Sequence, residues 1–304
     1  MAEAITEQES LEKGTSRREF IINTLRYLGA GAILVSAPSL VESAQQSTSL
    51  DDKVDSFIKK LRKERKIQDD EKTAWSVYDF TANQKLVAIN EELSLQSASM
   101  VKPLIALAFF HEVKQGRLSY DNRSKGMLRA SIRASDNKAT NWLIDRIGGH
   151  QRVQKILKEN YGSILKNTYI VERIPPAGNT YNNKSSARDY SRFLYALWHN
   201  QLPYSKELKG LLSLTKRNRI YTGTKVPKGT LVIDKTGSTG RLCGDMGMLI
   251  VKDKRGNQYP YTLIGIIQKD SKAEDYTAWI RARGNVIRQV SNIVYDYMKV
   301  RHKL

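Results

Sequence analysis

Ser97-Ala98-Ser99-Met100-Val101-Lys102-Pro103 is the stretch around which the rest of the sequence is organised, and the apolar run Leu104 to Phe110 follows it directly. Ser99 and Lys102 stand three residues apart, so on a helix their side chains share one face. A serine hydroxyl is a weak nucleophile at neutral pH and needs an adjacent base. A lysine serves as that base only if burial or a neighbouring cation lowers its pKa. The apolar run predicts a buried helix, which would lower the lysine pKa and place free N–H groups near the serine.

Ser-x-x-Lys is a common pair by itself, and two further clusters make it informative. Ser135-Asp136-Asn137 follows a helical stretch, and taken alone it indicates a helix N-cap. Lys235-Thr236-Gly237 ends a predicted strand, and taken alone it indicates a strand end with a turn. Ser-x-x-Lys, Ser-Asp-Asn and Lys-Thr-Gly in this order are the motif set of class A β-lactamases and penicillin-binding proteins.

On these motifs the chain resembles the class A β-lactamases, within the group of active-site serine β-lactamases and penicillin-binding proteins. The likeness spans roughly residues 50–300 and includes Tyr78-Asp79, Ala139 to Gly149 and Pro227 to Gly237. It implies an α/β (α+β) fold: a three-layer α-β-α sandwich with a five-stranded antiparallel sheet plus a helical lobe.

The resemblance also implies a role for each motif residue. Ser99 would attack the strained amide carbonyl and give an acyl-enzyme. Lys102 would accept its proton, directly or through water, helped by the positive charge of Lys235. Ser135 would pass a proton to the departing ring nitrogen. Asn137 would hold Lys102 and the side-chain amide of the substrate.

The Lys-Thr-Gly strand is expected to bind the rest of the substrate. Lys235 and Thr236 would bind the substrate carboxylate, with Gly237 beside them. The family's geometry implies an oxyanion hole made of the backbone N–H groups of Ser99 and Ser238. An arginine often supports carboxylate binding in this family, and Arg219 and Arg241 are both candidates.

The sequence departs from the family at the deacylation site. Class A enzymes carry a glutamate in an omega loop, with an asparagine four residues later, and the pair positions the hydrolytic water. The counterpart in this chain is Glu172, but Pro176 stands four residues later and Asn179 follows three beyond that. Two interpretations remain open: Glu172 activates the water, or it is a surface carboxylate paired with Arg173.

The N-terminal residues resemble an export signal. Arg17-Arg18 is followed by Phe-Ile and by a Gly/Ala-rich apolar segment from Tyr27 to Val41, which is typical of twin-arginine signals. Ser43 and Ala44 offer a cleavage site. The alternative is retention as an uncleaved membrane anchor, which the short apolar segment disfavours.

The sequence thus predicts three parts: a signal segment over residues 1–44, a linker over 45–50 and a catalytic domain over 51–304. The helical lobe, about residues 100–228, would be inserted between the segments of the sheet. We expect a periplasmic or secreted monomer, delivered by the twin-arginine export machinery.

Composition excludes several other classes. Without residues 1–44 the chain has 46 basic and 25 acidic residues, a net charge of +21. No basic stripe is interleaved with aromatic residues, so we expect no nucleic-acid partner, and attraction to an anionic envelope or to carboxylate substrates is favoured. Cys243 is the only cysteine, which excludes an internal disulfide, and the four histidines lack ligand spacing. We therefore expect no metal and no cofactor.

The residue pattern predicts strands at both ends of the chain and helices in its middle, which favours an antiparallel sheet with the terminal helices on one face. Helices are predicted at Asp51–Lys66 and Asp275–Tyr297, and through most of 121–200; strands are predicted at Thr73–Asp79, Lys85–Ile89, Thr230–Asp234, Met246–Lys252 and Tyr261–Gln268.

Three functions compete on this evidence. The first is an exported serine β-lactamase that acylates and deacylates at Ser99. The second is a peptidase of the penicillin-binding-protein type, which acts on peptidoglycan stem peptides and is trapped by β-lactams. The third is a slow-deacylating or inert binding module. The complete motif set counts against the third, the weak match around Glu172 favours the second or third, and we take the first as the prediction.

Overall fold

The computed structural model describes residues 49–175, 178, 180–214 and 217–304. The predicted signal segment and most of the predicted linker lie outside the described residues. None of the helices in this part of the chain has the length and hydropathy needed to cross a bilayer.

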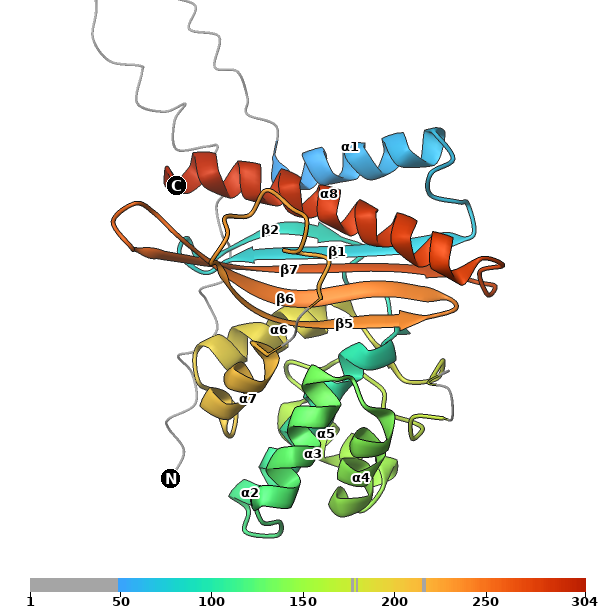
Figure 1. The fold of residues 1–304 in the computed structure, drawn as a ribbon, viewed down its shortest axis with the longest axis vertical. Coiled ribbons are helices and arrows are strands. Elements are labelled where there is room, and N and C mark those ends of the chain that lie inside the picture. The colour runs from blue at the N-terminus through green and yellow to red at the C-terminus, as the bar shows by residue number, and fades with distance from the viewer. Residues whose placement is uncertain (1–48, 176–177, 179, 215–216) are drawn as a thin grey trace, which may run out of the picture. The chain divides into compact units, whose positions relative to one another are not determined.

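A five-stranded antiparallel sheet forms the centre of the fold, with strand order β2-β1-β7-β6-β5 (Figure 1). The first long strand pairs with the last one, with Thr73 opposite Ile267. Strands from the beginning and the end of the domain therefore lie side by side within the sheet. The order leaves β2 and β5 as the edge strands. The five strands are β1 (Glu71–Asp79), β2 (Gln84–Ile89), β5 (Leu231–Thr239), β6 (Leu242–Lys252) and β7 (Gln258–Lys269).

Two terminal helices, α1 (Leu50–Lys63) and α8 (Tyr276–His302), cover one face of the sheet (Figure 1). Their apolar faces meet the sheet in one hydrophobic core, which includes Trp75 and Ile287. The predicted helix at Asp51–Lys66 is confirmed with a slightly earlier start, because the Ser49 hydroxyl caps it by accepting from Asp52 N.

A buried ion pair ties α8 to the start of β1. Glu71 accepts two hydrogen bonds from the Arg283 guanidinium, at 2.6 and 2.7 Å, and one from the Trp279 indole at 2.6 Å. Both charged side chains are buried, so this pair fixes the terminal helix to the sheet at one specific place.

The middle of the chain forms a helical lobe on the other face of the sheet (Figure 1). Its central helix α2 is buried from Lys102 to Glu112, which explains why its sequence is apolar on every side. The lobe comprises η1 (Ala98–Val101), α2 (Lys102–Lys114), α3 (Asn122–Arg133), α4 (Asn137–Ile147), α5 (His150–Tyr161), α6 (Ala187–Trp198) and α7 (Ser205–Leu212), with a small ribbon of β3 (Leu95–Gln96) and β4 (Lys184–Ser185).

The three-layer architecture and the antiparallel sheet are as predicted, but several boundaries were wrong. β6 begins at Leu242 rather than Met246, and β7 begins at Gln258 rather than Tyr261. Lys235-Thr236-Gly237 does not end its strand, since β5 continues to Thr239 and pairs with β6 throughout. The closing helix runs five residues past Tyr297, to His302. In these last two cases long-range pairing extends the element: β6 supports β5, and Asp79 holds His302 at 2.8 Å.

Candidate active site

The predicted nucleophile lies in a strained turn at the entrance to α2. Ala98 has a φ of 44°, in the left-handed region that residues with a Cβ rarely adopt. Ser99 follows in the 3₁₀ turn η1 and is half-buried, whereas Ala98 and Met100 on either side are fully buried. Strained backbone of this kind is concentrated at functional sites, and here it presents one serine from an otherwise buried segment.

Strand β5 lies directly against this turn, and Gly237 is what permits the contact. A Cβ at Gly237 would stand 3.1 Å from the Ser97 carbonyl oxygen and 3.2 Å from the Ala98 Cβ. Any larger residue would push the strand away from the turn. The glycine of the third motif therefore sets the spacing between the serine and the Lys-Thr-Gly strand.

Lys102 is fully buried at the first residue of α2, and its amine is held by the second motif. Its Nζ lies 2.8 Å from Asn137 Oδ1 and 3.1 Å from Ser135 Oγ, and it also donates to the Ser135 carbonyl oxygen. Ser135 is placed for these contacts by a φ of 56°, and Asp136 caps α4 by accepting from Ala139 N at 2.7 Å. The N-cap interpretation of Ser-Asp-Asn is thus correct for Asp136, while its two neighbours face the lysine.

A second lysine completes the cluster. Lys235 Nζ lies 3.2 Å from Ser135 Oγ, so one hydroxyl contacts both amines. The structure therefore brings together four predicted site residues from distant parts of the sequence: Lys102, Ser135, Asn137 and Lys235.

Burial changes the proton affinity of both amines. Desolvation, followed by the positive charge of Lys235, lowers the pKa of Lys102 to about 7. Desolvation lowers the pKa of Lys235 to about 8, with Asp234 and Asp245 opposing the shift and Arg219 adding to it. At neutral pH one amine can therefore be a free base beside a partner that keeps its charge.

Three of these polar groups can share their protons in a consistent way. As a charged amine Lys102 donates three hydrogen bonds, to the Ser135 carbonyl, to Asn137 Oδ1 and to the Ser135 hydroxyl. As a neutral amine it keeps two donors and has one lone pair that can accept a proton. The Ser135 hydroxyl also accepts from the charged Lys235. The arrangement leads from base to hydroxyl to cation, which is what a proton relay requires.

A positively charged side chain, that of Arg219, lies beside β5. Thr236 and Ser238 are half-buried on one face of the strand, as residues two apart must be. Arg219 donates to Ser238 Oγ at 2.7 Å and to the Gly244 carbonyl at 2.9 Å, and its backbone N–H is held by Asp245 at 2.6 Å. Of the two candidate arginines, Arg219 therefore lies against the Lys-Thr-Gly strand.

Arg241 takes a different position. It follows β5 in the turn to β6, and its guanidinium lies over the ring of Tyr181, 5.1 Å from the centroid. The two candidates therefore lie at different places: Arg219 contacts Ser238 of β5, and Arg241 lies in the turn that follows the strand.

Glu172 is held by its own loop. Its Oε1 accepts from Thr180 Oγ1 at 2.8 Å and from Asn182 N at 3.1 Å, and its Oε2 accepts from Asn182 Nδ2 at 2.7 Å. Burial acts to raise the pKa of Glu172, but these hydrogen bonds outweigh it and hold the pKa below the usual value. The alternative in which Glu172 pairs with Arg173 is wrong, because Arg173 forms its ion pair with Asp145 on α4.

Asn183 is a positioning residue that the sequence analysis missed. It is fully buried, its side chain accepts from Val171 N and Glu172 N, and its carbonyl accepts from Ser97 N at 2.9 Å. It therefore connects the Glu172 loop to the turn that carries Ser99. The adjacent asparagines at 182 and 183 were the available signal, since asparagine readily bonds to nearby backbone.

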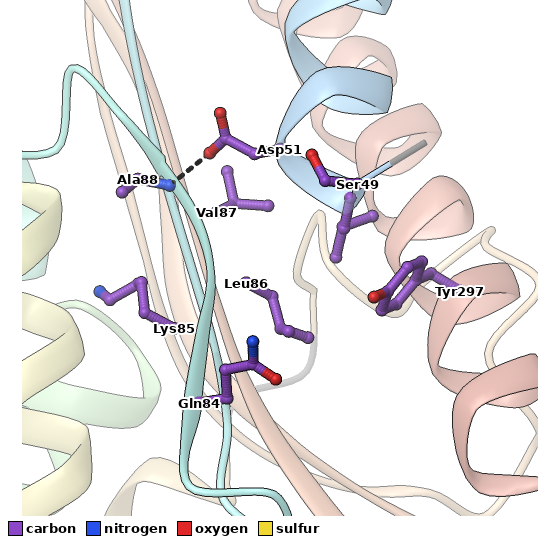
Figure 2. Close-up of a pocket in the computed structure, with 9 residues that line it drawn as sticks. Ser49, Asp51, Gln84, Lys85, Leu86, Val87, Ala88 and Tyr297 are labelled. Carbon is purple, nitrogen blue, oxygen red and sulfur yellow. Dashed lines mark hydrogen bonds between the residues drawn. The ribbon is translucent and has the colours of Figure 1, made fainter. Parts of the chain in front are cut away.

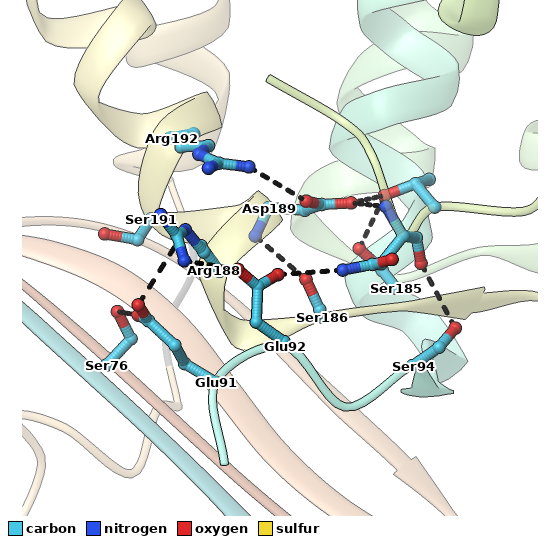
Figure 3. A network of polar contacts seen from close by, with 12 residues as sticks. Ser76, Glu91, Glu92, Ser94, Ser185, Ser186, Arg188, Asp189, Ser191 and Arg192 are labelled. Carbon is cyan, nitrogen blue, oxygen red and sulfur yellow. Dashed lines mark hydrogen bonds and ion pairs between the residues drawn. The ribbon is translucent and has the colours of Figure 1, made fainter. Parts of the chain in front are cut away.

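The beginning of this loop is fixed to α6 by a buried carboxylate (Figure 3). Asp189 Oδ2 accepts from Asn167 N at 2.7 Å and from Thr168 Oγ1 at 2.8 Å. Burial raises the pKa of Asp189. Figure 3 also shows Arg188, from the same turn of α6, directed toward Glu91 and Glu92. The loop is thus anchored at both ends, by Asp189 and by Asn183.

A separate pocket of about 290 Å³ lies at the opposite edge of the sheet (Figure 2). Ser49, Asp51, Lys85 and Tyr297 are among its lining residues, and Asp51 accepts from Ala88 N on β2. None of the predicted site residues lines it, so it is distinct from the serine and lysine cluster.

A family model described as "Beta-lactamase enzyme family" matches residues 53–127 and 124–298. Among curated relatives, Beta-lactamase 3 of Bacillus cereus is 24% identical over 242 residues, covering 74% of this chain and 72% of that protein.

Solved structures show the same fold. PBP-A is 22% identical with a TM-score of 0.67, over 82% of this chain and 96% of that chain. A variant of PBP-A has been solved as an acyl-enzyme complex with penicillin G. A representative class A β-lactamase from Bacteroides cellulosilyticus is 18% identical with a TM-score of 0.66, over 84% of this chain and 100% of that chain.

Proposed function

Because the chain belongs to the beta-lactamase enzyme family and is a serine β-lactamase-like hydrolase, we propose that it opens β-lactam amides through an acyl intermediate on Ser99. The observation that carries this proposal is the environment of Lys102. A fully buried lysine with a pKa of about 7 is a competent base at neutral pH, and it stands one helical turn from a serine held in a strained turn.

The contacts of Lys102 and Ser135 support the following acylation step. Ser99 Oγ bonds to the amide carbonyl carbon while its proton passes to Lys102, directly or through water. The C–N bond of the ring then breaks, and Ser135 donates its proton to the departing nitrogen. Lys102 returns the proton to Ser135, whose hydroxyl lies 3.1 Å from its Nζ. No proton is gained or lost over the step.

The Lys-Thr-Gly strand would bind the substrate. Lys235 keeps its charge over part of the neutral range and, with Thr236, would hold the substrate carboxylate. Arg219 adds a second positive charge at Ser238. The backbone N–H groups of Ser99 and Ser238 would bind the developing oxyanion, and loss of one such donor typically costs about 3–4 kcal/mol in the transition state.

The surroundings of Glu172, the candidate deacylation residue, support a second candidate function. Each oxygen of Glu172 accepts at least one hydrogen bond from its own loop, which favours a structural role over activation of a water molecule. An enzyme that acylates readily and deacylates slowly would behave as a penicillin-binding peptidase acting on peptidoglycan stem peptides. The hydrolase remains the first candidate, with β-lactams as its substrates.

Export is the remaining part of the proposal. The twin arginines at 17 and 18, followed by an apolar segment, support delivery of the precursor by the twin-arginine machinery to the periplasm or the exterior. The net charge of +21 outside the signal suits an anionic envelope and anionic substrates.

Mass spectrometry of the intact protein during a benzylpenicillin time course tests the mechanism. A transient adduct on Ser99 supports the hydrolase, and a persistent adduct supports the peptidase. Complete absence of an adduct, with no consumption of the antibiotic, would exclude both. The matched control is Ser99→Ala, which removes only a hydroxyl from a half-buried position, and a covalent adduct on that variant would refute the assignment of the nucleophile.

A further inference from the structure

We propose that Arg241 binds a second carboxylate, carried by the acyl side chain of the substrate, and thereby makes the enzyme selective for substrates that are anionic at that end. The inference rests on the proposed acylation at Ser99. It adds a specificity-determining residue and a substrate class to that reaction.

The order of groups along β5 places Arg241 at the correct end of the substrate. Lys235 and Thr236 come first in the strand and would take the ring carboxylate, and the Ser238 N–H, which would bind the reacting carbonyl, follows. Arg241 comes three residues later, in the turn to β6. In a β-lactam the reacting carbonyl lies between the ring carboxylate and the acyl side chain, so a substrate along this edge strand directs its side chain toward Arg241.

The guanidinium of Arg241 has unused binding capacity. Its buried Nε lacks a hydrogen-bond partner among the described residues. A buried donor without a partner is unfavourable in a folded protein, and native structures contain few of them. Guanidinium donors are arranged as a fork that matches a carboxylate.

The position of Arg241 at the end of β5 is also fixed. The Arg241 backbone N–H donates to Thr239 Oγ1 at 3.1 Å, and its carbonyl accepts from Lys269 N at 2.9 Å, so its backbone is fixed. The Tyr181 ring below the guanidinium belongs to the loop that Asn183 joins to Ser97. The contact therefore links the turn after β5 to this loop.

A matched pair of substrates isolates the effect. Carbenicillin differs from benzylpenicillin only by a carboxylate on the acyl side chain. The measured quantity is the second-order rate constant of acylation for each penicillin, followed by mass spectrometry of the adduct at fixed ionic strength. In the wild type the ratio of the carbenicillin constant to the benzylpenicillin constant reports on recognition of that carboxylate.

Arg241→Gln should lower this ratio by about tenfold or more, because a hydrogen bond to a charged group contributes about 1.5–3 kcal/mol. The constant for benzylpenicillin should change little. Arg241→Lys keeps the charge but loses the fork, so its ratio should fall between those of the wild type and Arg241→Gln.

The control is Arg255→Gln, which removes the same charge from an exposed position in the turn between β6 and β7. Since β6 has 11 residues, this turn is about 35 Å from Arg241 along the strand. The control should leave the ratio unchanged, which separates local binding from attraction by the overall charge.

An unchanged ratio in Arg241→Gln would overturn the inference while leaving acylation at Ser99 intact. An equal fall of both constants would also overturn it, since Arg241 would then support the Tyr181 loop. Failure of the wild type to acylate with either penicillin would instead refute the proposed function on which the inference depends.

Discussion

The acylation rate of Ser99 should follow the proton on Lys102, with a steep dependence on pH between 5.5 and 7. With the pKa of Lys102 near 7, about one half of the enzyme carries a neutral amine at pH 7 and about one tenth at pH 6. A lysine at the ordinary value of 10.5 would be neutral in only about one molecule in 3,000 at pH 7. Burial therefore increases the available base by roughly three orders of magnitude.

The alkaline side of the profile should belong to Lys235. Its pKa of about 8 means that the charge which binds the substrate carboxylate is lost as the pH rises further. The second-order rate constant of acylation should thus be bell-shaped, with flanks near 7 and 8 that belong to the coupled pair of lysines. In Lys235→Gln the acidic flank should move upward, because a cation that lowers the pKa of Lys102 has been removed.

Unfolding does not account for the alkaline fall. Both lysines have folded pKa values below the ordinary 10.5, so above pH 7 the folded chain binds fewer protons than the unfolded chain. Their contribution to stability therefore increases with pH up to about 10.5.

The assay is quenched-flow mass spectrometry of the benzylpenicillin adduct from pH 5.5 to 9.5 at constant ionic strength. A rate that is flat below pH 7, or an acidic flank above 9.5, would refute the role of Lys102 as the base.

Three further predictions follow from other parts of the chain. Glu172→Gln should acylate normally, and if Glu172 activates the hydrolytic water its adduct should persist, whereas equal adduct lifetimes in variant and wild type would exclude that role. Glu71→Ala should lower the free energy of unfolding by about 3–5 kcal/mol, because it leaves the buried charge of Arg283 unpaired, and a urea titration showing less than about 1 kcal/mol would contradict this. Replacing Arg17 and Arg18 together by lysine should leave the precursor in the cytoplasm, and fractionation that finds mature protein outside the cytoplasmic membrane would count against twin-arginine export.

The linear sequence was sufficient for those parts of the protein that depend on near neighbours. The spacing of Ser99 and Lys102, followed by a continuous apolar run, predicted a buried helix with a serine at its start. Alternation with a turn between two strands predicted the β1–β2 hairpin. The order of the three motifs predicted the family. Each motif is a local pattern that can be recognised without knowing which distant residues it contacts.

What the sequence could not supply depends on contacts between distant segments. The extent of β5 past Gly237 is set by pairing with β6, and the partner of Arg173 is set by the packing of its loop on α4. The Glu172 carboxylate is hydrogen-bonded within its own loop because the loop brings Asn182, ten residues later in the sequence, next to it.

The tertiary structure also decided the electrostatics of the site. Lys102 and Lys235 are separated by more than 130 residues in the sequence, yet Ser135 Oγ lies within 3.2 Å of both amines. A pKa depends on burial and on charges nearby in space, and neither can be read from residue order. The sequence by itself therefore indicated which motifs to consider together, and only the fold decided how their side chains share protons.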